Sequence, residues 1–403
     1  MPFALIVFAP QLKAQQEAVG FEPRYHHDVS RPNYLAEILP PQSPGIELPL
    51  PPPGESPAVV RGLYLNAWIF GSPRFYELVS LADTTEVNAF VIDVKDDRGF
   101  MTYQSNVPTA IAVGANRQVR ARDVRSRLAT MREHGIYPIA RIVVAKDPTL
   151  AEAKQDWAIG DSRGGLWRDA LDLKWVDVNN DSVWIYAADV AAEAVMLGFA
   201  EVQFDYVRFP DEPAERMQYA VFPAHVAGTS RRQVISRQLR YMKERIGALG
   251  VPLTLDVFGM TTSATGDMGI GQNWNDLVQL ADVLLPMVYP SHYPRNSYGI
   301  TFPNGEPYEI VRRALEAGIR RSANYDNPAR IRPYLQSFSI RGAIYRAHQL
   351  REQIRAVEDL GLTDWIFWNA SGRYPADAFR PATTTATLGL QPEEEVPESE
   401  ESD

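Results

Sequence analysis

The sequence predicts an α/β fold of the closed (β/α)8 class, a TIM barrel. Between residue 59 and about residue 374, short apolar runs alternate eight times with amphipathic stretches, and glycine often marks the join. The runs are largely apolar on both faces, as parallel strands under helices are. Eight such units over roughly 300 residues match a closed barrel. An open doubly wound sheet is the alternative, less favoured because no glycine-rich phosphate turn follows the first run.

The elements follow in order along the chain. The runs expected to form strands are 62–70, 89–97, 137–145, 200–210, 251–259, 282–289, 332–338 and 365–369. The helices expected between them are 74–82, 123–135, 179–198, 232–249, 274–280, 306–320 and 345–360. Two longer connections, 146–178 and 211–231, each follow a strand, so in a barrel they would lie on the catalytic face.

The fourth run, 200–210, carries an aspartate near its C-terminal end and stops at Pro210, which has no backbone donor for a sheet. Period-two alternation divides its side chains between two faces, with Val202, Phe204 and Tyr206 on one and Gln203, Asp205 and Val207 on the other. A carboxylate in an otherwise apolar strand suggests a functional site, although Asp205 could instead cap the following loop or pair with Arg208.

The chain divides into three parts by composition. Residues 1–58 form a Pro-rich N-terminal extension, residues 59–378 the barrel, and residues 379–403 an acidic tail that we expect to be disordered. The formal charge is -10, and the segment 393–403 contributes seven acids and no base. The barrel itself is therefore nearly balanced in charge.

Composition excludes several classes of function. A nearly balanced barrel lacks the basic face that binds nucleic acid, and no apolar run is long enough for a membrane span. The absence of cysteine excludes disulfides and thiolate chemistry. No dinucleotide, phosphate-loop or serine-nucleophile motif occurs, and no metal site or cofactor is expected. Residues 1–9 resemble the end of a secretory signal, which favours a secreted or cell-envelope protein over a cytoplasmic one.

Polar side chains collect at the C-terminal ends of the expected strands. In a barrel these ends meet on one rim, where active sites of this fold are built. The residues in question are Asp93, Lys95, Arg141, Asp205, Arg208, Asp256, Tyr289, His292, Gln336, Trp368 and Asn369. We assign these to a site for a carbohydrate substrate, with Asp93 and Lys95 more readily explained by an ion-pair network that shapes the rim than by proton transfer.

Asp205 and Asp256 are the predicted catalytic pair. They lie on consecutive strands, which are about 4.7–4.9 Å apart in a sheet. Glycoside hydrolysis needs two carboxyls, one to protonate the leaving oxygen and one to act as nucleophile or base. Two carboxyls this close do not both ionise easily, so one pKa rises towards that of an acid, while Arg141 or Arg208 could hold the other ionised. The alternative for Asp256 is a capping or loop-ordering role.

Aromatic side chains near the same rim could stack on the faces of sugar rings. They are Tyr64, Trp68, Tyr289, Tyr293 and Trp368. Each could equally serve to pack the core or the rim.

Six segments resemble a bacterial family of inferred glycoside hydrolases, defined as a domain of unknown function with an expected TIM barrel. They are VIDVKDDRG at 91–99, ARIVVAKD at 140–147, WVDVN at 175–179, QFDYVRFP at 203–210, LDVFG at 255–259 and LPMVYP at 285–290. The resemblance runs from about 61 to 374. It implies a hydrolase related to amylase-like and chitinase-like barrels, with Asp205 as the catalytic carboxylate of strand four.

The sequence departs from both of those assemblages. Amylase-like barrels supply a glutamate acid from strand five, where this chain has Asp256. The chitinase-like run Asp-x-x-Asp-x-Asp-x-Glu is absent at strand four, so a substrate-assisted mechanism is not supported. A rival interpretation is a barrel that binds glycans or cell wall without cleaving them, and a third is different chemistry on the same fold.

Overall fold

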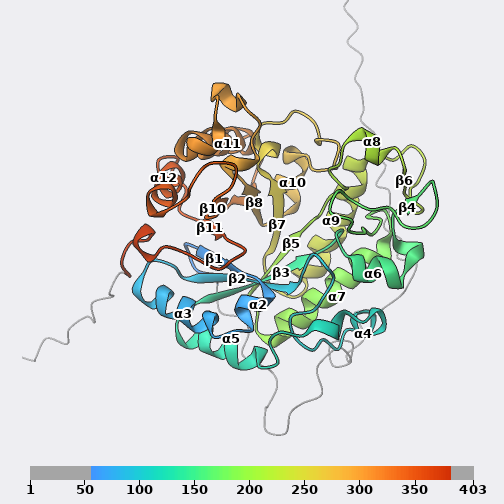
Figure 1. Cartoon of the computed structure of the whole chain (residues 1–403), viewed down its shortest axis with the longest axis horizontal. Helices are drawn as coiled ribbons and strands as arrows, with labels where there is room; N and C mark the ends of the chain where they lie inside the picture. The colour runs from blue at the N-terminus through green and yellow to red at the C-terminus, as the bar shows by residue number, and fades with distance from the viewer. Residues whose placement is uncertain (1–55, 383–403) are drawn as a thin grey trace, which may run out of the picture.

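The computed structural model describes residues 56–382. Most of the Pro-rich extension and most of the acidic tail lie outside the described residues. Figure 1 shows strands surrounded by helices, and the predicted closed eight-stranded parallel barrel is confirmed. The ring runs β1-β2-β3-β5-β7-β8-β10-β11 and closes where β11 pairs with β1.

Each predicted strand is present. Six lie within two residues of their expected ends, whereas the first and fourth runs were predicted to continue five residues beyond the ends of their strands. The barrel strands are β1 (Arg61–Leu65), β2 (Ala89–Lys95), β3 (Tyr137–Val143), β5 (Glu201–Asp205), β7 (Leu253–Phe258), β8 (Val283–Met287), β9 (Arg330–Ile331) with β10 (Tyr334–Gln336), and β11 (Trp365–Trp368). The seventh strand is interrupted between β9 and β10, where Pro333 cannot donate to a sheet.

The first run was predicted too long. Its strand ends at Leu65, and the remaining apolar residues form the short helix α2 (Ala67–Phe70). The side chain of Asn66 caps this helix by accepting a hydrogen bond from the N–H of Ile69 at 3.0 Å. An asparagine inside an apolar run was therefore the signal of a helix start.

The helices between strands also match expectation closely. They are α3 (Arg74–Thr84), α5 (Val124–Glu133), α7 (Asp181–Leu197), α9 (Arg231–Gly247), α10 (Trp274–Leu280), α11 (Pro307–Ser322) and α12 (Ala347–Glu358). α7 ends at Gly198, whose φ of 114° is open to glycine and costly for other residues. One further helix, α4 (Pro108–Val113), lies where a loop was expected, although it has the favourable proline at its start and glycine at its end.

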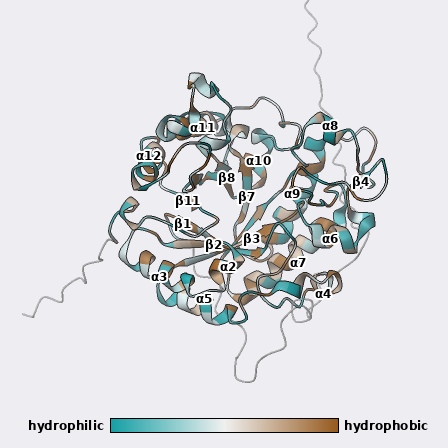
Figure 2. Cartoon of the chain, in the orientation of Figure 1, coloured by the Kyte–Doolittle hydropathy of each residue, from teal (hydrophilic) through white to brown (hydrophobic). Residues whose placement is uncertain are grey.

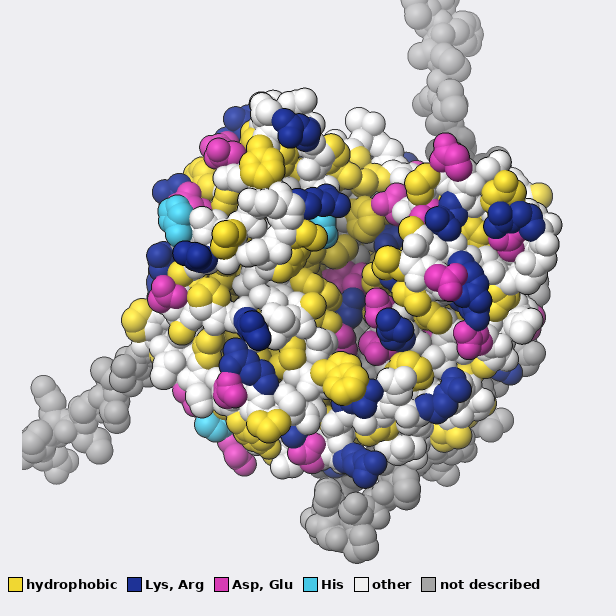
Figure 3. All heavy atoms as spheres, viewed as in Figure 1, with side chains coloured by type: hydrophobic (Ala, Val, Ile, Leu, Met, Phe, Trp, Pro, Cys, Tyr) yellow, Lys and Arg dark blue, Asp and Glu magenta, His cyan; other side chains and the backbone are white. Residues whose placement is uncertain are grey.

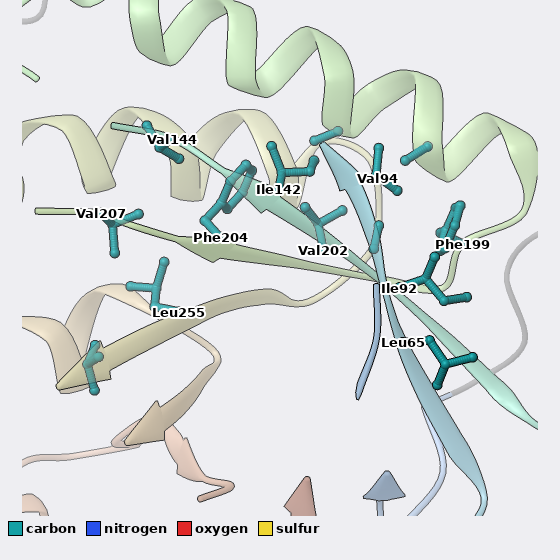
Figure 4. Packing of buried hydrophobic residues seen from close by; sticks show 14 of the residues in the cluster. Leu65, Ile92, Val94, Ile142, Val144, Phe199, Val202, Phe204, Val207 and Leu255 are labelled. Carbon is teal, nitrogen blue, oxygen red and sulfur yellow. The ribbon is translucent and has the colours of Figure 1, made fainter. Parts of the chain in front are cut away.

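Most of the core lies between the outer face of the barrel and the helices. A second, smaller apolar cluster, which includes Val91, Ile139 and Ile366, is formed by strand residues that face the other way. In Figure 4, Ile142, Val202 and Phe204 point from β3 and β5 towards a covering helix. The helices present their apolar sides to the strands and their polar sides outwards (Figure 2). Gln203 and Asp205 face the opposite way, into the barrel, as the period-two pattern predicts.

The two long connections contact each other beside the barrel mouth. The connection after β3 contains α6 (Pro148–Ala153) and β4 (Gly160–Asp161), and the connection after β5 contains α8 (Ala214–Met217) and β6 (Ala220–Val221). β4 and β6 pair as antiparallel strands. The two insertions thus form one wall at the C-terminal ends of β3 and β5.

Candidate active site

A cavity of about 460 Å³ opens at the C-terminal end of the barrel. Figure 3 shows this face hollowed near its centre, with acidic and basic side chains deep inside. The cavity brings together seven predicted site residues: Arg141, Asp205, Arg208, Asp256, Tyr289, His292 and Trp368. Tyr293, also considered for stacking, lines it as well.

Arg141 stands between the carboxyl groups. One Nη donates to Oδ1 of Asp93 at 2.5 Å, and the other Nη donates to Oδ2 of Asp205. Its Nε lies 3.6 Å from Oδ2 of Asp256. Strands β2, β3, β5 and β7 each supply one of these four residues, so strand pairing itself assembles the group.

Asp205 lies at the last position of β5 and is 6% exposed. Besides Arg141, its carboxylate accepts a hydrogen bond from the N–H of Tyr206 at 2.5 Å. Two donors, one of them charged, therefore compensate the carboxylate anion. The predicted alternative of a pair with Arg208 is not the arrangement found, because Arg208 lies over the rings of Tyr206 and Phe258.

Asp256 is the more buried of the two carboxyls, at 1% exposed. Its Oδ2 accepts a hydrogen bond from Nε2 of Gln203 at 2.9 Å, whereas its Oδ1 has no partner among the described residues. Burial raises the pKa of Asp256 well above its usual value, and the nearby charge of Asp205 raises it further. The two carboxyls thus differ. The Asp205 carboxylate accepts hydrogen bonds from two donors, whereas the Asp256 carboxyl has a raised pKa and retains its proton more readily.

The other charged groups support this inequality. Burial alone would lower the pKa of Arg141, but the carboxylates of Asp93 and Asp205 outweigh it, and the pKa is raised. Burial also raises the pKa of Asp93, which accepts a hydrogen bond from the hydroxyl of Tyr64 at 2.5 Å. A single guanidinium faces three buried carboxyls, so the group retains a proton more readily than separate aspartates would.

Tyr206 lies in the cavity, contrary to its predicted position on the outer face with Val202 and Phe204. Its φ is 54°, in the left-handed region that non-glycine residues rarely adopt. This backbone turn interrupts the period-two alternation, so Val207 joins the core under the helices instead. Strained backbone of this kind is often found at functional sites.

Aromatic rings form one wall of the cavity. Trp368 stacks on Tyr64 with ring centroids 3.6 Å apart, and the guanidinium of Arg141 lies 5.0 Å from the Trp368 ring. Tyr289 and His292 contact each other edge to face at 5.2 Å. Trp368 thus presents its ring to the cavity, and Tyr64 supports this ring from behind.

Six predicted site residues are not in the lining of this cavity. Asp93 and Tyr64 are buried behind it, in contact with Arg141 and Trp368 respectively. The remaining four have other roles. Lys95 is buried and forms an ion pair with Asp147 at 2.6 Å, because a bulge between Asp93 and Lys95 turns it out of the barrel. Trp68 is 64% exposed and covered by the guanidinium of Arg120 at 3.4 Å.

The other two of the four organise loops. The amide of Gln336 bonds to the N–H of Ser291 and to the side chain of Asn304. The amide of Asn369 donates to the carbonyls of Ser337 and Arg373.

Two residues of the hydrogen-bond network around Asp256 were not assigned to the site from the sequence. Tyr334, fully buried on β10, accepts a hydrogen bond from Nε2 of Gln203 at 2.8 Å, and Gln203 in turn holds Asp256. Gln203 shared the face of Asp205 in the predicted strand, which was an available signal. Tyr334 had the same inward register as Gln336, but nothing in the sequence linked it to strand four.

Between residues 56 and 382, no group of three or more histidine and acidic side chains is placed to hold a metal ion. The same stretch contains no helix with the length and apolar character needed to cross a membrane.

Solved structures share the fold. The glycoside hydrolase domain of PgaB (BpsB) from Bordetella bronchiseptica is 13% identical, covers 78% of this chain and 95% of that one, and has a TM-score of 0.55. A chitobiase from Flavobacterium johnsoniae is 12% identical over 79% of this chain and 47% of its own, with a TM-score of 0.51.

A hypothetical protein from Ruminiclostridium thermocellum is 38% identical over 48% of this chain and 97% of its own, with a TM-score of 0.44. No curated protein sequence matches the chain. A family model described as "Putative glycosyl hydrolase domain" matches residues 62–374, which include every strand of the barrel except the first residue of β1. The chain therefore belongs to this glycosyl hydrolase family.

Proposed function

We propose that the protein hydrolyses a glycosidic bond in a poly- or oligosaccharide, with Asp256 as the general acid and Asp205 as the nucleophile or water-activating base. The observation that carries this proposal is the inequality of the two carboxyls around Arg141. Asp205 accepts hydrogen bonds from a guanidinium and a backbone N–H. Asp256 is buried beside it with a raised pKa.

The proposed roles follow from that inequality. The Asp256 carboxyl retains its proton and gives it to the leaving glycosidic oxygen as the bond breaks. The Asp205 anion stabilises the positive charge that develops on the sugar ring, and attacks the anomeric carbon or deprotonates a water. Arg141 donates a charge-assisted hydrogen bond to the Asp205 carboxylate, and its own charge is balanced by Asp93.

The walls of the cavity suit a sugar. Trp368 offers an apolar ring face, Arg208 and His292 offer polar groups, and the volume lies within the usual range for ligand sites, about 300–1,000 Å³. Because the fold is shared by enzymes with many activities, the residues and not the barrel carry the proposal.

The test compares Asp205→Asn with the wild type on fragments of peptidoglycan, chitin and α-glucan. Asn keeps the shape of the side chain but cannot act as nucleophile or base, so we expect turnover to fall by at least about 10²- to 10⁴-fold while sugar binding persists. Asp326→Asn, at an exposed position, is the matched control and should retain full activity. If both variants bind and cleave as the wild type does, the assignment of Asp205 is wrong.

The rival of a non-catalytic glycan-binding barrel gives a different result. It predicts that the wild type releases no reducing ends from any glycan that it binds, and that Asp205→Asn leaves both binding and biological effect unchanged.

A further inference from the structure

A second, larger hollow adjoins the cavity on the same face. This groove has a volume of about 1190 Å³ and shares Tyr289, His292 and Trp368 with the cavity. It continues over the loops after β10 and β11 and the start of α12. A glycan held at Asp205 and Asp256 could therefore extend directly into it.

The groove is strongly basic. Its charged lining consists of Arg74, Arg346, Arg351, Arg373 and a single acid, Asp377. His292 and His348 line it as well. In Figure 3, dark-blue side chains lie to the left of the central hollow, on the side where Figure 1 places α12. A cleft lined by charges of one sign raises the local concentration of oppositely charged ligands.

Three of the four groove arginines form no ion pair with an acidic side chain among the described residues. Within residues 56–382, Arg346 and Arg373 have no carboxylate at ion-pair distance, and Arg351 donates only to the backbone carbonyl of Asp377. Of the four, only Arg74 has an acidic partner, Glu77.

Helix stability does not explain the arginines either. Arg346 is the N-cap residue of α12, Arg351 lies one turn further, and the first turn contains no acid. The start of a helix carries positive partial charge, so cations there are unfavourable.

The lining of the groove also contains polar groups without partners. The hydroxyl of Ser337, a residue 5% exposed, and that of Tyr289, a residue 4% exposed, bond to no other described residue. Buried polar atoms are nearly always hydrogen-bonded in folded proteins. These two hydroxyls therefore have unused hydrogen-bonding capacity in the wall of the groove.

We propose that the groove binds negatively charged groups on the glycan, so that the substrate is an acidic saccharide carrying carboxylate, sulfate or phosphate. The arginine fork pairs with each of these oxyanions through two parallel hydrogen bonds. Phe338 and Tyr345 beside the arginines offer ring faces to the neutral parts of the sugar. The link to cleavage depends on the function proposed above, whereas the binding does not.

Binding is measured by calorimetry on the full-length chain, with Asp205→Asn used to prevent turnover. The probes are uronic-acid oligosaccharides and their carboxyl-reduced neutral counterparts, with sulfated and phosphorylated oligosaccharides, each beside its uncharged parent, as separate arms. We expect at least one acidic probe to bind about tenfold or more tightly than its neutral counterpart. The arm that shows the preference identifies the oxyanion.

Two triple variants locate the effect. Arg346→Gln, Arg351→Gln and Arg373→Gln together should abolish the preference for the acidic probe and leave affinity for its neutral counterpart unchanged. Arg122→Gln, Arg132→Gln and Arg240→Gln remove the same charge from exposed arginines outside both hollows, and should keep the preference.

The outcomes separate the two proposals. If no acidic probe binds more tightly than its neutral counterpart, or if the groove variant keeps the preference, this inference is overturned even if the wild type cleaves a neutral glycan. If acidic probes bind through the groove but the wild type cleaves none of them or any other glycan, the inference stands and the proposed hydrolase function fails.

Discussion

At the scale of single residues, the arrangement of the cavity depends on Arg141. It is 3% exposed and contacts Asp93 and Asp205 directly, with Asp256 at 3.6 Å. If fewer carboxylates surrounded the Arg141 guanidinium, no carboxyl of the group would have its pKa raised by a neighbouring anion. A buried pair of carboxylates without the cation would be strongly disfavoured. The combination of one cation and several acids permits both an anion and an acid in one small space.

Asp256→Asn tests the raised pKa through stability. Below the unfolded pKa of about 3.9, the group is protonated in both states and its titration costs nothing. As pH rises towards the folded pKa, the unfolded chain loses this proton before the folded one, so the wild type loses stability. Asn does not titrate. We therefore expect the unfolding free energy of the variant, relative to the wild type, to increase as pH rises above the unfolded pKa of about 3.9.

Urea denaturation at several pH values measures this difference, with Asp326→Asn as an exposed control that should show no such trend. The Asp256→Asn variant should also lose most of its activity. A stability difference that stays constant over the whole range would contradict the raised pKa.

Tyr206 offers a second residue-scale prediction, because its backbone is left-handed. An L-residue in this region costs about 1–2 kcal/mol, a cost that glycine avoids. Tyr206→Gly and Tyr206→Ala both remove the ring, so both should weaken sugar binding equally. The glycine variant should nevertheless be more stable than the alanine variant by about 1 kcal/mol.

The neighbouring position provides the control. Val207 is not among the residues with positive φ, so the order should reverse there, with Val207→Ala more stable than Val207→Gly. Thermal denaturation of the four variants gives both comparisons. The same order at both positions would show that the strain at Tyr206 is not real.

At the scale of elements, the sequence predicts the strands and helices well because their signals are local. Largely apolar runs mark the strands, and helices such as α7 begin after Asn180 and end before Gly198 as capping rules require. The site is predicted less completely. Where period two holds, as at Gln203 and Asp205, the direction of the side chain follows from the sequence.

Two predictions of side-chain direction are wrong because the backbone departs from regular strand geometry. A bulge after Asp93 turns Lys95 outwards, and the left-handed Tyr206 exchanges places with Val207. Neither the bulge nor the positive φ can be predicted from the local sequence, because both depend on contacts with neighbouring strands and with the long insertions. Side chains such as Gln336 were correctly placed at a strand end, but loops then took up their hydrogen-bonding capacity.

The bulge in β2 makes a prediction about Lys95. Because Lys95 and Asp147 are each 1% exposed, Lys95→Met leaves a buried carboxylate without its cation, and we expect a loss of about 3–5 kcal/mol in stability. Adding Asp147→Asn removes that charge and keeps the oxygen that caps α6 through the N–H of Leu150. The double variant should therefore recover most of the loss.

Activity per folded molecule should remain close to wild type in the double variant, because neither residue lines the cavity. Chemical denaturation and steady-state rates provide the two measurements. A double variant that folds normally but has lost activity would instead support the assignment of Lys95 to the substrate site.

At the scale of the whole molecule, closure of the ring determines whether the site exists. β1 pairs with β2 on one side and with β11 on the other. Arg61 and Trp365 are therefore neighbours in the sheet, although they lie near opposite ends of the barrel sequence. The cavity takes side chains from β3, β5, β7, β8, β10 and β11. Trp368 at the end of β11 also stacks on Tyr64 of β1. The site is thus shared between the first and last strands.

Two truncations test the importance of this closure. Ending the chain after residue 382 keeps β11 and the contact of Phe379 with Trp365, so we expect a melting temperature and an activity close to those of the full chain. Ending it after residue 362 deletes β11 and leaves β1 and β10 without their shared neighbour. Unpaired parallel edges and an open core should abolish cooperative unfolding and promote association. Circular dichroism melts and size-exclusion chromatography distinguish the outcomes, and a shorter chain that melted as sharply as the longer one would mean that seven strands suffice without closure.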